Sequence, residues 1–339
     1  MGDQTGQMVV TGSRVEEIEV YSLDKEDALI YRYGYTSEDE LYDKPQNEVK
    51  VEEITDENEN VTLYNSNLAY VEGRNFIGVV RYDWILKNIP RGKLTKMVEL
   101  TDEFLDFLYY LDNKDEYFNN SIPYKRLMWV GSRHTNPHAG GGLGGGYTAY
   151  NGCSYDILNS SFANFAHSWV VGHEIGHEMD VNNYHMNLFG EVTNNWYAEE
   201  CMAEFTKGIR TANNVVNISD KNDPINKMDV FDILAFWFKF RAYYGDNDFI
   251  VKMHQYMQKI STESIEDTGS KLAVYVTRIL KRDASDYFLK HGFELSAESI
   301  EYCNTYPKFT IDISGINWSN QDEFRAEEKR LFNLRYKGN

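Results

Sequence analysis

The sequence HEIGH at residues 173–177, followed by GEVTNN at residues 190–195, decides how the rest of this chain is interpreted. In a helix, His173 and His177 lie one turn apart on one face, where two neutral imidazoles can hold one Zn²⁺. Glu174, beside the first histidine, is then in the position of a general base. A helix that leads into the motif is indicated by apolar residues at helical spacing: Phe162, Phe165, Ala166, Trp169 and Val170.

A third ligand is needed, because a catalytic zinc site has three protein ligands and one open position. Residues 191 to about 210 are expected to form a helix on which Glu191, Asn195 and Glu199 share one face. With Glu191 as the ligand, Asn195 would be placed to orient a ligand histidine. Glu191 could instead serve only as a favourable charge in the first helical turn. The other candidates for the third ligand are Glu199, Glu200, His185 and Asp180.

HEIGH followed at this distance by GEVTNN resembles the pattern of the enhancin-like, mucin-directed zinc metallopeptidases, a gluzincin family. Two later segments are similar to the same family, MDVFDILAFWFKFRAYYGDNDF at 228–249 and DYFLKHGF at 286–293, and the likeness covers residues 68–307. It implies that His173, His177 and Glu191 hold zinc and that Glu174 is the general base. Glu178 departs from the family, where Asn is frequent, on a side of the helix expected to face away from the metal.

The resemblance implies an α+β fold: a zincin-like metallopeptidase core, with a small sheet and the active-site helix, and a helical C-terminal subdomain. We expect an acidic, β-rich region at 1–67, the catalytic subdomain at 68–214 and the helical subdomain at 215–339. Strands are expected at 76–86, 125–131 and 309–318. Helices are expected at 101–112 (beginning at Thr101), 191–210, 227–244, 248–260, 269–281, 285–291 and 320–336.

The glycine-rich segment HAGGGLGGGYTAYNGCSYDI, residues 138–157, is open to two interpretations. A phosphate-binding loop is not expected, because Tyr147 and Thr148 follow the glycines where such a loop has Lys and Ser or Thr. In zincin folds the strand before the active-site helix lies along the cleft and pairs with the substrate backbone, and residues 147–156 are in the position for this. A loop without any contact role fits the sequence equally well.

Several side chains near the motif are candidates for contacts with the substrate. The oxyanion formed during peptide hydrolysis needs a second donor, for which Tyr197, Tyr184 and His185 are candidates. The family implies an O-glycosylated, mucin-like protein substrate. Side chains that could contact its sugar are Tyr147, Tyr150, Asn194, Trp196 and Tyr197, although Trp196 and Tyr197 could equally be packing residues.

Composition excludes some classes of partner. The formal charge of −19 argues against a nucleic-acid surface and against an anionic membrane surface. No apolar run is long enough to span a membrane, and the first residues do not form a signal peptide. Secretion is expected from the family alone, with the chain beginning after a removed signal. Cys153, Cys201 and Cys303 do not form a disulfide framework, so free buried thiols are expected. The alternative function is a non-catalytic glycoprotein-binding or adhesion module on a zincin scaffold.

Overall fold

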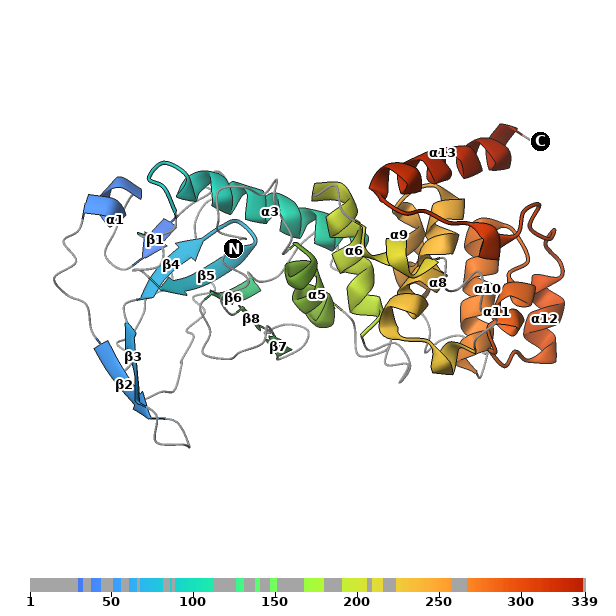
Figure 1. Cartoon of the computed structure of the whole chain (residues 1–339), viewed down its shortest axis with the longest axis horizontal. Coiled ribbons are helices and arrows are strands. Elements are labelled where there is room, and N and C mark those ends of the chain that lie inside the picture. The colour runs from blue at the N-terminus through green and yellow to red at the C-terminus, as the bar shows by residue number, and fades with distance from the viewer. Residues whose placement is uncertain are drawn as a thin grey trace, which may run out of the picture.

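The computed structural model describes residues 30–32, 38–43, 51–55, 61–65, 68–81, 86, 89–112, 126–130, 138–140, 147–150, 168–179, 191–205, 209–215, 224–257 and 267–337. Most of these residues are helical. The strands lie at one end of the molecule and a group of helices at the other, with α5 (Ser168–Met179) and α6 (Thr193–Phe205) between them (Figure 1).

The described strands pair into one larger and one smaller group. The larger has the order β1-β4-β5-β6-β8-β7. Its β5–β6 and β6–β8 pairs are parallel, and the other pairs are antiparallel. The strands are β1 (Ile30–Arg32), β4 (Leu68–Glu72), β5 (Phe76–Arg81), β6 (Arg126–Val130), β7 (His138–Gly140) and β8 (Tyr147–Tyr150), and a separate hairpin joins β2 (Val51–Thr55) to β3 (Val61–Asn65).

The expected strand at 125–131 is confirmed by β6, and the one at 76–86 corresponds to the shorter β5. The expectation for residues 147–156 needs a correction. β8 starts at Tyr147, but it is paired on both sides, so the edge strand is β7, which lies just before the glycine run. Ala139 lies opposite Thr148, and the two short strands pair as neighbours along the chain. Residues 151–157 lie outside the described residues.

The helix expected at 101–112 is confirmed as part of a longer helix, but its predicted start at Thr101 is wrong. Helix α3 runs from Leu94 to Leu111. Gly92 has φ 82°, a conformation that favours glycine, and the turn it forms leads directly into the helix. Thr101 is buried in the helix interior instead of capping its start. The apolar face of α3 packs against α5. Together they form the smaller of two hydrophobic cores, which includes Leu94, Val98, Leu105, Leu108, Ile175 and Met179.

Most helices expected after residue 225 are confirmed, with ends shifted by up to three residues. In the first of these helices, α8, Asp229 accepts hydrogen bonds from the backbone N–H groups of Phe231 and Asp232 and so caps the start. Gly245, with φ 104°, ends the helix. The helices are α8 (Val230–Tyr244), α9 (Asp248–Met257), α10 (Thr268–Leu280), α11 (Ser285–Lys290) and α13 (Gln321–Lys337), together with α12 (Ala297–Cys303), which sequence reasoning missed. Residues 258–260 lie outside the described residues.

Two expected elements differ from those observed. The strand expected at 309–318 is not formed: Asp312 accepts a hydrogen bond from the backbone N–H of Ser314 and caps a short 3₁₀ turn, η8 (Ile313–Gly315). Ile313 and Ser314 are adjacent and both buried, whereas a strand with one buried face would bury only one of them. The helix expected at 191–210 begins at Thr193 and ends at Phe205, and after extended Ile209 the chain forms the 3₁₀ helix η5 (Arg210–Asn213).

The main core lies around α8 and is rich in aromatic side chains. Phe236 stacks on Tyr287, with ring centroids 4.8 Å apart, and Phe240 stacks on Phe288 at 5.8 Å. The segments 228–249 and 286–293, which are each similar to the same family, therefore pack on each other. Cys201 and Cys303 are free and buried, as expected, and Cys153 lies outside the described residues. Among the described helices, none is long and apolar enough to cross a membrane.

Candidate metal centre

Two glycines allow α5 and α6 to pack with their backbones close together. A Cβ atom on Gly172 would lie 2.9 Å from Ala198 Cα, and one on Gly176 would lie 2.7 Å from the carbonyl oxygen of Asn194. Any side chain at either position would force the helices apart, because real Cβ atoms do not approach backbone atoms this closely. The glycine inside HEIGH therefore helps to bring the first turn of α6 to the histidines on α5.

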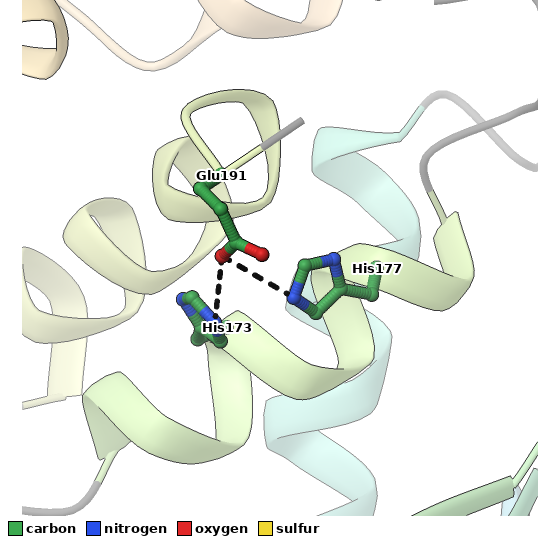
Figure 2. A group of neighbouring side chains, drawn as sticks. All are labelled: His173, His177 and Glu191. Carbon is green, nitrogen blue, oxygen red and sulfur yellow. Dashed lines mark ion pairs between the residues drawn. The ribbon is translucent and has the colours of Figure 1, made fainter. Parts of the chain in front are cut away.

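The three side chains expected to bind zinc come together beside this contact between α5 and α6 (Figure 2). Glu191 Oε2 lies 3.4 Å from His173 Nε2 and 3.6 Å from His177 Nε2. All three potential ligand atoms lie within 4.8 Å of one another. The histidines are partly buried, whereas the Glu191 side chain is 59% exposed, so the group opens to solvent on the glutamate side.

The donor set fits a zinc ion. Ligand atoms about 2.0–2.2 Å from a tetrahedral zinc would lie about 3.4 Å apart, close to the two separations from Glu191. The side-chain NH₂ of Asn194 lies among them, 3.2 Å from His173 Nε2, 3.0 Å from His177 Nε2 and 3.4 Å from Glu191 Oε2. Its Oδ1 is buried without a hydrogen-bond partner in the described part of the chain. The NH₂ group thus lies near the point on which the three potential ligand atoms converge. A metal ion bound there would displace it.

Asn195 orients His173, as expected from the sequence. His173 Nδ1 donates to Asn195 Oδ1 at 2.6 Å, which leaves Nε2 with its lone pair directed toward Glu191. The NH₂ group of Asn195 donates to the backbone carbonyl of Glu191, in the turn just before α6. The asparagine is buried and held at both ends, so the ring orientation of His173 is fixed by α6.

Glu174 lies beside the histidines in a largely buried position, 6% exposed. Burial, together with the nearby charge of Glu191, raises the pKa of its carboxyl group to about 7. Burial also lowers the pKa of His177, with a contribution from His173, although Glu191 opposes this. A neutral His177 is the form that binds a metal ion.

The structure distinguishes Glu191, in the turn before α6, from two glutamates inside that helix. Glu199 is completely buried and accepts hydrogen bonds from the backbone N–H groups of Arg210 and Thr211 and from the Thr211 hydroxyl. Glu200 is buried against Arg241, with Oε1 2.5 Å from Nε. Neither carboxylate faces the histidines, so neither supplies the third ligand. Asp180, Tyr184 and His185 lie outside the described residues.

Two other expected contacts need correction. Tyr197 is fully buried, its hydroxyl donates to Asp112 Oδ1 at 2.6 Å, and its ring stacks on His254 at 5.0 Å. Trp196 is 1% exposed and packs edge-on against Trp237 at 5.3 Å. Both are therefore packing residues and do not reach the site, because α6 is covered by other helices along these faces. Tyr147 and Tyr150 are the first and last residues of β8, but their side chains lie outside the described part of the structure.

Two features of the site were missed from the sequence. Asn194 was considered only for sugar contact, yet its NH₂ group lies among the three donor atoms. The pair Gly172 and Gly176 was also missed, although its spacing of four residues was a readable signal for close helix packing.

Comparison with known proteins identifies the class to which this fold and site belong. Residues 53–292, more than half of the chain, match the family Peptidase M60, enhancin and enhancin-like. The chain belongs to this family of metallopeptidases. None of the curated proteins compared with the chain matches it in sequence.

Solved structures resemble the chain in fold. A functionally unknown conserved protein from Bacillus anthracis has a TM-score of 0.63 at 17% identity, over 73% of this chain and 53% of that one. The ZmpB metallopeptidase from Clostridium perfringens has a TM-score of 0.57 at 21% identity, over 75% and 52%. A metallopeptidase solved in complex with Tn antigen has a TM-score of 0.58 at 15% identity, over 74% and 53%. This chain thus aligns with about half the length of these proteins.

Proposed function

We propose that this protein is a zinc-dependent endopeptidase in which His173, His177 and Glu191 hold the metal and Glu174 is the general base. The observation that carries the proposal is the convergence of the three donor atoms, with 3.4 and 3.6 Å between Glu191 Oε2 and the two histidine Nε2 atoms. Membership of a metallopeptidase family supports the same conclusion.

The chemistry divides between the metal and the protein. Zinc, when bound, acts as a Lewis acid toward the scissile carbonyl and makes a water molecule acidic enough to attack near neutral pH. Glu174 takes a proton from the attacking water as the oxygen–carbon bond forms. It then passes that proton to the amide nitrogen as the carbon–nitrogen bond breaks, so that a carboxylate and an amine are released. Asn195 keeps His173 in the orientation that presents Nε2.

We further propose that the strands β4–β8 and helix α5 form a zincin-like α+β core. Residues 68–214 would be the catalytic subdomain, residues 215–339 the helical subdomain, and residues 1–67 an acidic β-rich region. The placement of α5 and α6 between the strands and the later helices supports this division (Figure 1). Substrate would then enter from the exposed side of Glu191.

The proposed substrate is an O-glycosylated, mucin-like protein outside the cell. One similar structure, a metallopeptidase, was solved in complex with Tn antigen, which supports a glycoprotein substrate. Secretion is proposed from the family alone. Tyr147 at the start of β8 is retained as a proposed cleft residue.

The test is digestion of a mucin-type glycoprotein and of its enzymatically deglycosylated form. We expect cleavage that stops with a zinc chelator and returns with added Zn²⁺. Glu174→Gln should lower the rate by roughly 10²- to 10⁴-fold while zinc content stays near one per chain. Glu204→Gln, the same change at an exposed position of α6, is the control.

Each outcome bears on a different part of the proposal. Binding of the glycoprotein without cleavage would favour the non-catalytic module and reject the peptidase. Equal rates on both substrates would reject the glycan requirement alone. Loss of zinc in Glu174→Gln would show that Glu174 acts through the metal site instead of as a base.

A further inference from the structure

The helical end of the molecule carries a basic hollow that the proposed peptidase chemistry does not use. It has a volume of about 300 Å³ and is lined by Lys252, Gln255 and Tyr256 of α9, Arg278 and Ile279 of α10, and Lys281, which follows α10. Among the described residues that line it, three are cationic and none is acidic. The chain as a whole has 53 acidic and 34 basic residues, so this is a local reversal of its charge.

Tyrosine rings hold the cations of this hollow in place. The Arg278 guanidinium lies 5.7 Å from the ring centre of Tyr256 and 5.2 Å from that of Tyr302, and its Nε donates to the Tyr302 hydroxyl at 3.2 Å. Lys281 Nζ lies 5.8 Å from the ring centre of Tyr306. A guanidinium fixed in this way loses little conformational entropy when it binds a ligand.

Lys252 of α9 also lines the hollow and is fixed in a similar manner. Its Nζ lies 5.3 Å from the ring centre of Tyr244 and 3.2 Å from Asp248 Oδ2. Asp248 offsets part of this charge, but its own side chain also accepts a hydrogen bond from Tyr110. Lys252 therefore adds a second cationic side chain to the lining that contains Arg278.

We propose that this hollow binds an acidic sugar, meaning a glycan unit that carries a carboxylate or sulfate group. The planar guanidinium suits the two oxygens of such a group, and the lysines complete its charge. Nucleic acid is disfavoured because bases need open aromatic faces, whereas Tyr256 is already stacked on Tyr275 at 5.0 Å and contacted by Arg278.

The hollow lies on α9 and α10, and the metal centre lies on α5 and α6. His254, next in sequence to the lining residues, faces the other way and stacks on Tyr197 of α6. Sugar binding would therefore add a second contact with a glycan-bearing partner, separate from the histidines. The inference does not depend on peptidase activity, because the site is defined by binding alone.

The experiment is calorimetric titration of the full chain with four oligosaccharides or oligomers of matched length at about 0.15 M salt. Chondroitin sulfate carries carboxylate and sulfate groups, hyaluronan carries carboxylate only, chitin oligomer is neutral, and oligothymidylate is an anion without sugar acids. We expect binding of chondroitin sulfate, and the hyaluronan arm distinguishes which acidic group suffices. The neutral oligomer should not bind.

Matched variants locate the binding. Lys252→Gln combined with Lys281→Asn removes two charges from the hollow, and Asn tolerates the φ of 54° at position 281. We expect the Kd to rise roughly tenfold or more. Lys227→Gln combined with Lys329→Gln makes the same charge change at exposed positions outside the hollow and should leave the Kd within about twofold. Circular dichroism should show that all variants are folded.

Arg278→Lys adds a test of geometry, since it keeps the charge and removes the planar group. Weaker binding by this variant supports the site. The proposal is overturned if neither acidic oligosaccharide binds the wild type, if both double variants weaken binding equally, or if Arg278→Lys binds as tightly as the wild type. Equal binding of oligothymidylate would also overturn it, because the hollow would then attract any polyanion.

Discussion

The turn that leads into helix α6 and the helix itself both carry glutamates, and the surroundings of these glutamates differ completely. In the turn, the Glu191 side chain is 59% exposed and lies beside two histidines. Inside the helix, Glu199 and Glu200 are 0% and 1% exposed and are held by Thr211 and Arg241. The comparison teaches that a glutamate's role here depends on what covers it, since the three lie close together in the sequence.

The buried part of α6 belongs to a network that joins this helix to later helices. Arg241 of α8 pairs with Glu200 and also with Glu328 of α13. Gln321 and Arg325 of α13 donate to the carbonyl of Ala203 in the last turn of α6. The network holds the C-terminal half of α6, and the glycines of α5 allow close approach of its N-terminal half. The predictions below separate these two roles.

The largest effect should come from the exposed glutamate. Glu191→Gln removes a negatively charged ligand, so we expect peptidase activity to fall roughly 10³-fold and zinc affinity to fall with it. The free energy of unfolding of the metal-free protein should change by less than about 0.5 kcal/mol, because the side chain is exposed. Chelator competition and urea unfolding measure the two quantities. Zinc affinity equal to that of the Glu204→Gln control would reject Glu191 as a ligand.

The opposite pattern is expected at the buried part of α6. Glu200→Ala leaves Arg241 with one carboxylate partner fewer in a buried place, so the free energy of unfolding should fall by about 3–5 kcal/mol. Urea unfolding of the metal-free protein measures this, with Glu204→Ala as the exposed control on the same helix. A loss below about 1 kcal/mol would mean that Glu328 alone satisfies Arg241.

A smaller change should act on both regions through the helix contact. In Gly176→Ala the new methyl group would meet the backbone of Asn194, with 2.7 Å to its oxygen and 2.8 Å to its Cα. We expect a loss of about 1–3 kcal/mol in stability together with weaker zinc binding, because α6 must move away from α5. Gly315→Ala is the control, since its added Cβ would have no neighbour nearer than 3.9 Å. Unchanged zinc affinity in Gly176→Ala would show that the site tolerates a wider helix spacing.

The smallest effect concerns pH and the buried Glu199. Burial raises the pKa of its carboxyl group to about 7 from 4.5, despite the opposing hydrogen bonds from Thr211 and Arg210. The folded protein therefore binds a proton that the unfolded chain releases between these values, and stability falls as the pH rises from about 4.5 to about 7. We expect about 1–3 kcal/mol of this loss to be absent in Glu199→Gln. Urea unfolding at several pH values gives the difference, and parallel curves for both proteins would contradict the prediction.

The sequence by itself determined what depends on one helix at a time. HEIGH places two imidazoles and a carboxylate by the geometry of a single turn, and Asn195 follows Glu191 by the same geometry. The helices α8 and α10 were predicted from their local sequence pattern for the same reason. These features are local, so no distant residue is needed to place them.

Only the tertiary structure decided which polar residues face the site. Tyr197 was a candidate oxyanion donor until its contact with Asp112, 85 positions away, placed it in the core. Glu200 is set apart from Glu191 by Arg241, which lies 41 positions further along the chain. The start of α3 and the turn at 313–315 likewise follow from contacts and caps that spacing does not encode. Burial is a property of the whole packed molecule, and a helix repeat alone cannot say which of its faces will be covered.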